Sequence, residues 1–321
     1  MTTVSNYLNG RHSQMSAVTR DRVRAVIEQL GYHPNHVARS LATRRTATIG
    51  LIVSELTNAL YPPVILGAES ACRAAQYSLL LANAPDIEAE RRAVELMRRK
   101  QVDGLILFSV SFIDIANEHL VQTLNTGVPL VVINRAVPED VPIPRVLLDN
   151  FRGAYLATRH LVELGHRRIA HLAGPANRFT GRDRRAGYLA ALDEAGLPAE
   201  PALVIEGDYS FESGYRAMRA VLDSRPSAVF IGGDAMALGA LRAIRDCGLR
   251  VPDDVSLVAF GNPDFVHFAT PALTTVDLPI VEAGRIAVEL LLERLSGREL
   301  TGQARLLEPR LLVRESTARL S

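Results

Sequence analysis

The first helical pattern of the chain separates hydrogen-bonding side chains from apolar ones. Val4, Tyr7 and Leu8 recur at the spacing of one face of an α-helix. The other positions carry small groups that donate or accept hydrogen bonds: Thr2, Thr3, Ser5, Asn6 and Asn9. Such a helix fits the major groove of DNA, where these groups can read the edges of base pairs. We therefore predict that these five residues contact DNA.

Positive charge is concentrated at the same end. Residues 1–46 hold seven arginines and two acidic residues, a net charge of +5, whereas the whole chain carries only +1. A basic segment attracts the phosphate backbone of DNA. Charge alone is equally compatible with a solvated helical face, so it supports the DNA-binding interpretation without deciding it.

A second helix and a short third one are expected next. Ser16 or Thr19 can cap the second helix, and Gly31 ends it. A connector containing Pro34 then leads into a helix over 35–41, which is too short to be stable alone. We therefore expect this short helix to be ordered mainly when it is paired with the same helix of a second copy on DNA.

From Thr48 onward, short apolar runs alternate with longer amphipathic ones. The runs typical of strands are 48–54, 78–81, 104–108, 130–133, 168–173, 203–206, 228–232 and 255–260. The patterns typical of helices are 64–75, 87–99, 117–125, 150–164, 182–195, 211–224 and 234–247. Apolar strands separated by helices predict parallel sheets covered on both faces. Because one series ends near residues 148–150, we predict an α/β fold of two doubly wound parallel-sheet subdomains behind a partial helical head.

Composition and motifs exclude several classes of protein. The chain has 321 residues, of which 48% are apolar, and it contains neither a run long enough to span a membrane nor a secretion signal, so we expect it inside the cell. Cys72 and Cys247 lack the spacing of a zinc site or disulfide framework and are expected to be packing residues. His166 and His171 are likewise assigned to packing or surface roles. No nucleotide-binding, hydrolase or metalloprotease motif is present, so we predict no catalytic residue, metal or cofactor.

The most specific motif is Tyr-His-Pro-Asn-His-Val-Ala-Arg-Ser-Leu-Ala at 32–42. Together with Thr-Val-Ser at 3–5 and Leu-Gly-His-Arg-Arg-Ile-Ala-His-Leu-Ala-Gly-Pro at 164–175, it resembles the lactose and galactose repressor family of bacterial transcription regulators. The resemblance runs from Met1 to about Thr317. It implies a cytoplasmic, homodimeric regulator, in most cases a repressor, that binds operator DNA and a small-molecule effector such as a sugar or sugar derivative.

The resemblance also implies a division of the chain. A partial helix-turn-helix head would span 1–31, and a hinge helix and linker 32–46. The two effector-binding subdomains would span 47–148 plus about 278–307, and 149–277 plus about 308–317, with three crossovers between them. In the hinge helix, Asn35, Ala38 and Leu41 would contact DNA, Leu41 as a wedge in the minor groove.

Residues at strand ends match the effector site of the family. They are Asn58, Tyr61, Asn134, Arg184, Tyr209, Asp234 and Asn262. A guanidinium fork and an aromatic face suit a polyol or a small anion. Other roles stay open: the two tyrosines can be core aromatics, the asparagines at 58 and 134 can stabilise turns, and Asp234 can cap a helix. Arg184 can instead pair with a neighbouring carboxylate, although the resemblance favours the cleft.

Two departures from the family pattern concern the effector. Gly233 and Gly261 stand where many relatives have an amide and a carboxylate that accept hydrogen bonds from sugar hydroxyls. We therefore expect weak binding of plain hexoses, and an effector that is an unusual sugar, a phosphorylated metabolite or a non-sugar. Asn262 is expected to replace part of the lost polarity.

The start of the sequence raises a further expectation. In the family about fifteen residues precede the point that matches Met1, and they include the first helix of the head. An N-terminal truncation of the sequence and a loss of specific operator binding are both compatible with this pattern. The alternatives to a repressor are therefore an effector-binding protein or co-regulator without specific DNA contact and, from another class, an enzyme.

Overall fold

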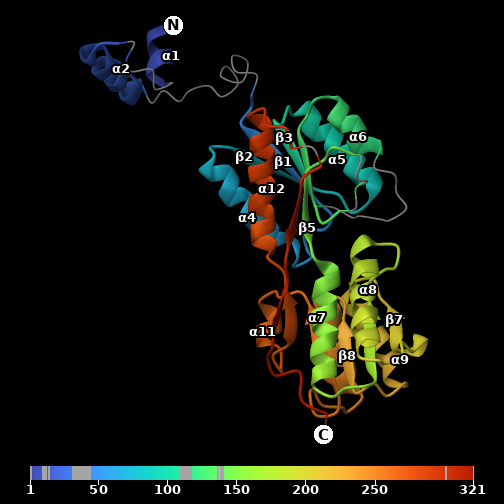
Figure 1. Cartoon of the computed structure of the whole chain (residues 1–321). Helices are drawn as coiled ribbons and strands as arrows, with labels where there is room; N and C mark the ends of the chain where they lie inside the picture. The colour runs from blue at the N-terminus through green and yellow to red at the C-terminus, as the bar shows by residue number, and fades with distance from the viewer. Residues whose placement is uncertain are drawn as a thin grey trace. The chain divides into compact units, whose positions relative to one another are not determined.

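Figure 1 shows the computed structural model of the chain, which describes residues 2–8, 13, 15–30, 45–108, 118–135, 137, 141–300 and 302–320. The chain divides into two units, Met1–Ala47 and Thr48–Ser321. Among the helices that these ranges contain, none has the length and apolar character needed to span a membrane.

The first unit contains the two predicted helices of the head, α1 (Thr2–Leu8) and α2 (Ala17–Leu30). Ser16 caps α2, because its Oγ accepts a hydrogen bond from the N–H of Thr19 at 3.2 Å. No residue of α2 is buried. Of the predicted DNA contacts, four belong to α1, whereas Asn9, Asn35, Ala38 and Leu41 lie outside the described residues.

The second unit begins with a six-stranded parallel sheet in the order β11-β5-β4-β3-β1-β2. Its strands are β1 (Thr48–Val53), β2 (Ser78–Asn83), β3 (Gly104–Phe108), β4 (Leu130–Ile133), β5 (Arg145–Leu148) and β11 (Ala304–Leu307). Its helices are α4 (Tyr61–Ala74), α5 (Ile87–Arg99), α6 (Glu118–Asn125) and α12 (Ile280–Leu295). Helices α4 and α12 cover one face, and α5 and α6 cover the other (Figure 1).

A second six-stranded sheet has the order β12-β10-β9-β8-β6-β7. Its strands are β6 (Ile169–Ala173), β7 (Val204–Glu206), β8 (Ala228–Ile231), β9 (Ser256–Phe260), β10 (Thr274–Asp277) and β12 (Arg310–Leu312), which is antiparallel to β10. Helices α7 (Asn150–Glu163) and α8 (Phe179–Glu194) pack on one face, and α9 (Phe211–Leu222) and α10 (Asp234–Asp246) on the other. A 3-10 turn (Pro201–Leu203) and α11 (Phe265–Phe268) complete this part.

The chain passes between the two sheets three times, after β5, after β10 and after β11. Two parallel-dominated α/β sheets confirm the predicted fold class. Strands β5 and β10 were not predicted from the sequence, and in β10 polar side chains interrupt the apolar pattern of Thr-Thr-Val-Asp. One packing prediction was wrong: Cys72 is buried, but Cys247 follows the last turn of α10 and is exposed.

Candidate functional site

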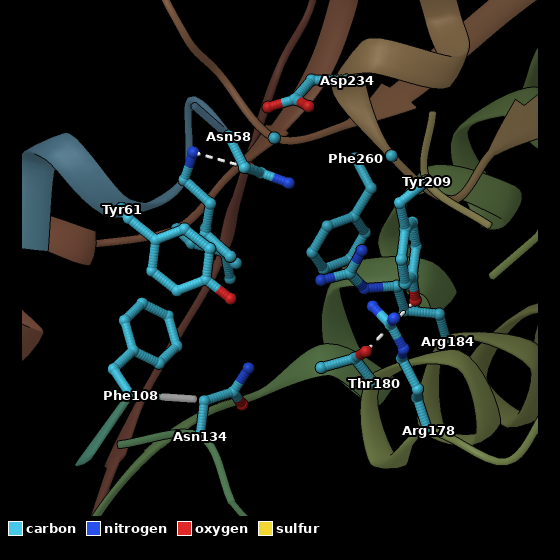
Figure 2. Close-up of a pocket in the computed structure, with 14 residues that line it drawn as sticks. Asn58, Tyr61, Phe108, Asn134, Arg178, Thr180, Arg184, Tyr209, Asp234 and Phe260 are labelled. Carbon is cyan, nitrogen blue, oxygen red and sulfur yellow. Dashed lines mark hydrogen bonds between the residues drawn. The ribbon is translucent and has the colours of Figure 1, made fainter. Parts of the chain in front are cut away.

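A cavity lies where the carboxyl ends of strands from the two sheets face each other. It encloses about 780 Å³ of free space, including the part that is open to solvent. Its lining residues are Asn58, Leu60, Tyr61, Phe108, Asn134, Arg178, Thr180, Arg184, Tyr209, Gly233, Asp234, Phe260, Gly261 and Leu278. Figure 2 shows that side chains from both sheets point into the same space. This is the position at which open α/β sheets bind ligands.

Aromatic rings form the two opposing walls of the cavity (Figure 2). On the side of the first sheet, the rings of Tyr61 and Phe108 lie 5.1 Å apart between centroids. On the side of the second sheet are Tyr209 and Phe260. Burial raises the pKa of Tyr61, so its hydroxyl stays protonated at neutral pH and can donate a hydrogen bond.

Arg184 is the most buried charged group of the lining, with 7% of its surface exposed. Its Nε donates to Asn150 Oδ1 at 2.9 Å, and its Nη1 donates to the carbonyl oxygen of Gly232 at 2.6 Å. The guanidinium carbon lies 3.8 Å from the centre of the Phe260 ring. Burial lowers the pKa of Arg184, but an arginine in a protein remains charged. The side chain is therefore a fixed cation at the wall.

A side-chain network connects Arg184 with the first sheet. Asn150, the first residue of α7, donates from Nδ2 to Asn134 Oδ1 at 2.9 Å and to the carbonyl oxygen of Leu148 at 2.9 Å. Asn134 follows β4 with φ at 49°, a left-handed conformation that asparagine tolerates. The predicted site residues Arg184 and Asn134, which come from different sheets, are thus joined through Asn150.

Asp234 lies at the start of α10 and beside the cavity, but it is not the helix cap, because Gly233 is the N-cap residue and no side chain makes a capping hydrogen bond there. It is the first residue of α10, and its Oδ1 accepts a hydrogen bond from the N–H of Ala235 at 2.6 Å. It also lines the cavity. Burial raises the pKa of its carboxyl group, and the hydrogen bond from Ala235 and the charge of Arg184 oppose that shift.

Tyr209 is held in place by close backbone contacts. Its φ is 73°, and its hydroxyl lies 3.1 Å from Thr180 Oγ1. A Cβ atom at Gly174 would lie 2.0 Å from the Tyr209 hydroxyl oxygen, and one at Gly233 would lie 2.9 Å from the ring. The guanidinium groups of Arg178 and Arg184 lie 5.8 and 5.6 Å from the ring centre. The absence of a side chain at Gly233 therefore makes room for the aromatic ring.

Gly261 makes room for a carboxylate in a similar way. Its φ is 107°, which side chains rarely adopt, and a Cβ atom there would lie 2.8 Å from Asp234 Oδ2. Both departures from the family pattern thus have a local steric cause, since Tyr209 and Asp234 occupy the neighbouring space.

The structure brings six of the seven predicted effector residues to the cavity: Asn58, Tyr61, Asn134, Arg184, Tyr209 and Asp234. Asn262 is not among the lining residues. Its amide is engaged elsewhere, because Nδ2 donates to Asp277 at 3.3 Å and Oδ1 accepts from Thr275 at 3.0 Å and from Arg314 at 2.7 Å. Asn262 therefore does not provide the cavity with the polar group that was expected to compensate for Gly233 and Gly261.

Several residues that line the cavity were not predicted from the sequence. Arg178 and Thr180 flank the start of α8, which begins at Phe179 rather than at Arg182 as expected. Phe108 and Phe260 end β3 and β9, and their position at the carboxyl ends of strands was the signal that could have identified them. Among the described residues, no group of three or more histidine, cysteine or acidic side chains is placed to hold a metal ion.

Comparison with known proteins agrees with this arrangement. Residues 1–35 match the family of bacterial regulatory proteins called the lacI family, and residues 158–317 match the periplasmic binding protein-like domain. The "HTH-type transcriptional repressor PurR" of Erwinia tasmaniensis is 38% identical over 320 residues, which cover 99% of this chain and 93% of that protein. The PurR protein of Escherichia coli O139:H28 is 38% identical over 322 residues, with the same coverage.

Two solved structures are similar over nearly the whole chain. The lac repressor dimer bound to operator and the anti-inducer ONPF has a TM-score of 0.87 and 30% identity, covering 98% of this chain and 94% of that one. A complex of the transcriptional regulator CelR with cellobiose has a TM-score of 0.78 and 36% identity, covering 97% and 94%. The chain therefore belongs to the lacI family of bacterial regulatory proteins.

Proposed function

We propose that this chain is a cytoplasmic transcription repressor that binds operator DNA as a homodimer and is controlled by a small molecule in the cavity. The names of its relatives support the first part, since the PurR proteins are repressors and the lac repressor is a dimer bound to operator. The cellobiose complex supports the second, because that regulator carries a small molecule.

The observation that carries the proposal is the mixed origin of the cavity lining. Tyr61 and Asn134 come from the first sheet, whereas Arg184, Tyr209 and Asp234 come from the second. A molecule that contacts both walls favours one arrangement of the two sheets over others. The six lining residues predicted from the sequence are proposed as effector contacts, and Asn262 is proposed to stabilise the crossover region instead.

The head and hinge are proposed to read DNA. Thr2, Thr3, Ser5 and Asn6 belong to α1, and the proposal adds Asn9 and the hinge residues Asn35, Ala38 and Leu41. The subdomain boundaries proposed for the second unit, 47–148 plus about 278–307 and 149–277 plus about 308–317, place a complete sheet in each part.

An apolar face on α4 and α12 supports self-association. Leu66 is 62% exposed and Val281 is 48% exposed, and both line a broad groove between the two helices. Exposed apolar surface of this kind marks a site of protein contact. We propose that a second copy of the chain covers it.

A DNA-binding titration tests the proposal. A duplex selected from random sequence by the protein would be labelled, and its fluorescence anisotropy would be followed with increasing protein, with a scrambled duplex as control. We expect the selected duplex to bind at least about tenfold more tightly, a difference of about 1.4 kcal/mol. Equal binding of both duplexes, together with a ligand in the cavity, would identify the chain as an effector-binding protein that lacks specific DNA contact.

A further inference from the structure

The two ends of the cavity differ in charge. Asp234 lies at one end, and Arg178, Thr180 and Arg184 lie at the other (Figure 2). The lining thus holds two arginines and one aspartate. Burial raises the pKa of Asp234 and disfavours its charged form, so the positive end dominates the electrostatics of the cavity.

Arg184 carries a buried positive charge that forms no ion pair among the described residues, and the carboxylates of Asp234 and Asp183 act on it only from a longer distance. Its hydrogen bonds go to two uncharged oxygens, Oδ1 of Asn150 and the carbonyl of Gly232. Within the part of the chain that the structure describes, no carboxylate lies at ion-pair distance from Arg184, and its Nη2 group donates no hydrogen bond. A buried cation without a counter-ion is unfavourable. An anionic ligand would supply the missing charge and accept the remaining hydrogen bonds.

The start of α8 adds a second, independent preference for an anion. Its N-cap residue is Arg178, no side chain makes a capping hydrogen bond there, and its first turn holds no acidic residue. Three other helices do have such a cap, because Asp86, Asp149 and Ser210 accept hydrogen bonds at the starts of α5, α7 and α9, whereas α4, α10 and α12 also lack one. The N-terminus of a helix is partially positive, so it disfavours an arginine and favours an anion.

We propose that the cavity binds a small organic anion whose phosphate or carboxylate group sits between Arg178, Thr180 and Arg184. The inference rests on the proposed function, because it names the chemical class of the controlling molecule. Guanidinium groups, a hydroxyl and a helix N-terminus are strong donors to such oxygens. The uncharged part of the ligand lies between the aromatic walls, and Asp234 accepts hydrogen bonds from its far end.

Thermal unfolding of the full chain in different anions tests this class. The melting temperature would be measured by calorimetry at constant ionic strength, with chloride replaced stepwise by inorganic phosphate or by acetate. We expect a saturable rise of about 2 °C or more in at least one of the two anions, as a ligand at several times its Kd produces. A rise with phosphate alone identifies a phosphate ligand, and a rise with acetate identifies a carboxylate.

Two variants separate the site from general salt effects. Arg178→Gln removes one guanidinium group of the site and should abolish the rise. Arg182 is on the same helix, but it is exposed and pairs with Asp183. The Arg182→Gln variant should therefore show the same rise in melting temperature as the wild-type chain. An equal rise in the Arg178→Gln variant and the wild-type chain would overturn the proposal, as would the absence of a rise in the wild-type chain.

Failure of this inference can be told from failure of the proposed function. If a neutral molecule such as an unmodified hexose binds in the cavity and changes DNA affinity, the anion is wrong and the repressor proposal stands. If phosphate or acetate stabilises the chain through Arg178 but no cavity ligand alters DNA binding, the anion is right and the regulatory role is wrong.

Discussion

At the scale of single residues, Arg184 supports the wall of the cavity and is also a proposed effector contact. The sequence identified it as an effector contact through family resemblance. The structure adds that it donates to Asn150 Oδ1 and to the carbonyl of Gly232 while nearly fully buried. Removing it therefore alters the cavity and also leaves two buried acceptors without their donor.

Arg184→Ala should lower both stability and ligand binding. Loss of a partner for a buried polar group costs about 1–3 kcal/mol, so we expect the free energy of unfolding to fall by about 2 kcal/mol or more in urea titrations. Arg182→Ala, on the exposed side of α8, should change it by less than about 0.5 kcal/mol. Equal stability of the Arg184→Ala variant and the wild-type chain would show that these hydrogen bonds contribute nothing.

Gly261→Ala should be destabilising for two separable reasons. The new methyl group must adopt a φ of 107° and approach Asp234 Oδ2 to 2.8 Å, and each effect costs on the order of 1 kcal/mol. Gly196→Ala is the matched control, because its φ is 64° and nothing lies near the new Cβ atom. The cost of the contact should fall when Asp234→Ala is combined with Gly261→Ala, because the carboxylate is removed and only the Cβ atom of residue 234, at 3.2 Å, remains. If the double variant shows no recovery relative to the two single ones, the contact does not restrict residue 261.

At the scale of elements, β6 places an uncharged histidine in the core between the second sheet and α8. His171 is fully buried and stacks on Phe230 with ring centroids 4.6 Å apart, and its Nδ1 lies 3.1 Å from the carbonyl oxygen of Phe230. Burial lowers its pKa from 6.5 to about 4. The packing role predicted for this residue agrees with this environment.

Stability should therefore decrease in mild acid. Because the folded pKa of His171 is the lower one, the unfolded chain binds more protons between pH 6.5 and about 4. The contribution of neutral His171 to the free energy of unfolding is complete above pH 6.5 and is lost as the pH falls towards the folded pKa of about 4. The loss approaches about 3 kcal/mol. In the His171→Phe variant, the decrease in the free energy of unfolding that His171 causes between pH 6.5 and about 4 should be absent. An unchanged slope in the variant would assign the acid sensitivity to other groups.

What the sequence could predict depended on the length and regularity of each element. Long apolar strands and amphipathic helices such as α10, at Asp234–Asp246 against the predicted 234–247, agree with their patterns to within a few residues. Strands β5 and β10 were not predicted, and the structure identifies them by their pairing, β5 with β4 and β11 and β10 with β9. Arg178 was not predicted as a lining residue, because α8 starts three residues earlier than expected and Arg178 is therefore its N-cap residue. Asn262 does not line the cavity, because Arg314, which is distant in sequence, donates a hydrogen bond to its side-chain oxygen.

At the scale of the whole molecule, the apolar face of α4 and α12 should control self-association. Leu66→Asp places a charge on this face and should weaken dimerisation at least about tenfold in sedimentation experiments, equivalent to about 1.4 kcal/mol. Leu96→Asp is a matched control on α5, which covers the opposite face of the sheet, where Leu96 is 49% exposed. Equal weakening by both variants, or by neither, would exclude this face as the specific interface.

At the same scale, three crossovers connect the two sheets, and the cavity between them is lined by residues of both. Asn150, at the start of α7 just after the first crossover, joins Asn134, which follows β4 of the first sheet, to Arg184 beside the second sheet. A ligand that contacts these side chains changes the relative energy of the arrangements that the two sheets can adopt. Control of DNA binding requires that this difference in energy extend to the head.

The coupling between ligand and DNA tests the central claim most directly. The Kd of the chain for its selected duplex would be measured by fluorescence anisotropy with and without a saturating cavity ligand found by thermal-shift screening. We predict at least about a fivefold change in the Kd of the wild-type chain, in either direction, and less than about a twofold change in an Arg184→Gln variant at the same ligand concentration. A ligand that saturates the wild-type cavity and leaves the Kd for DNA unchanged would contradict the account.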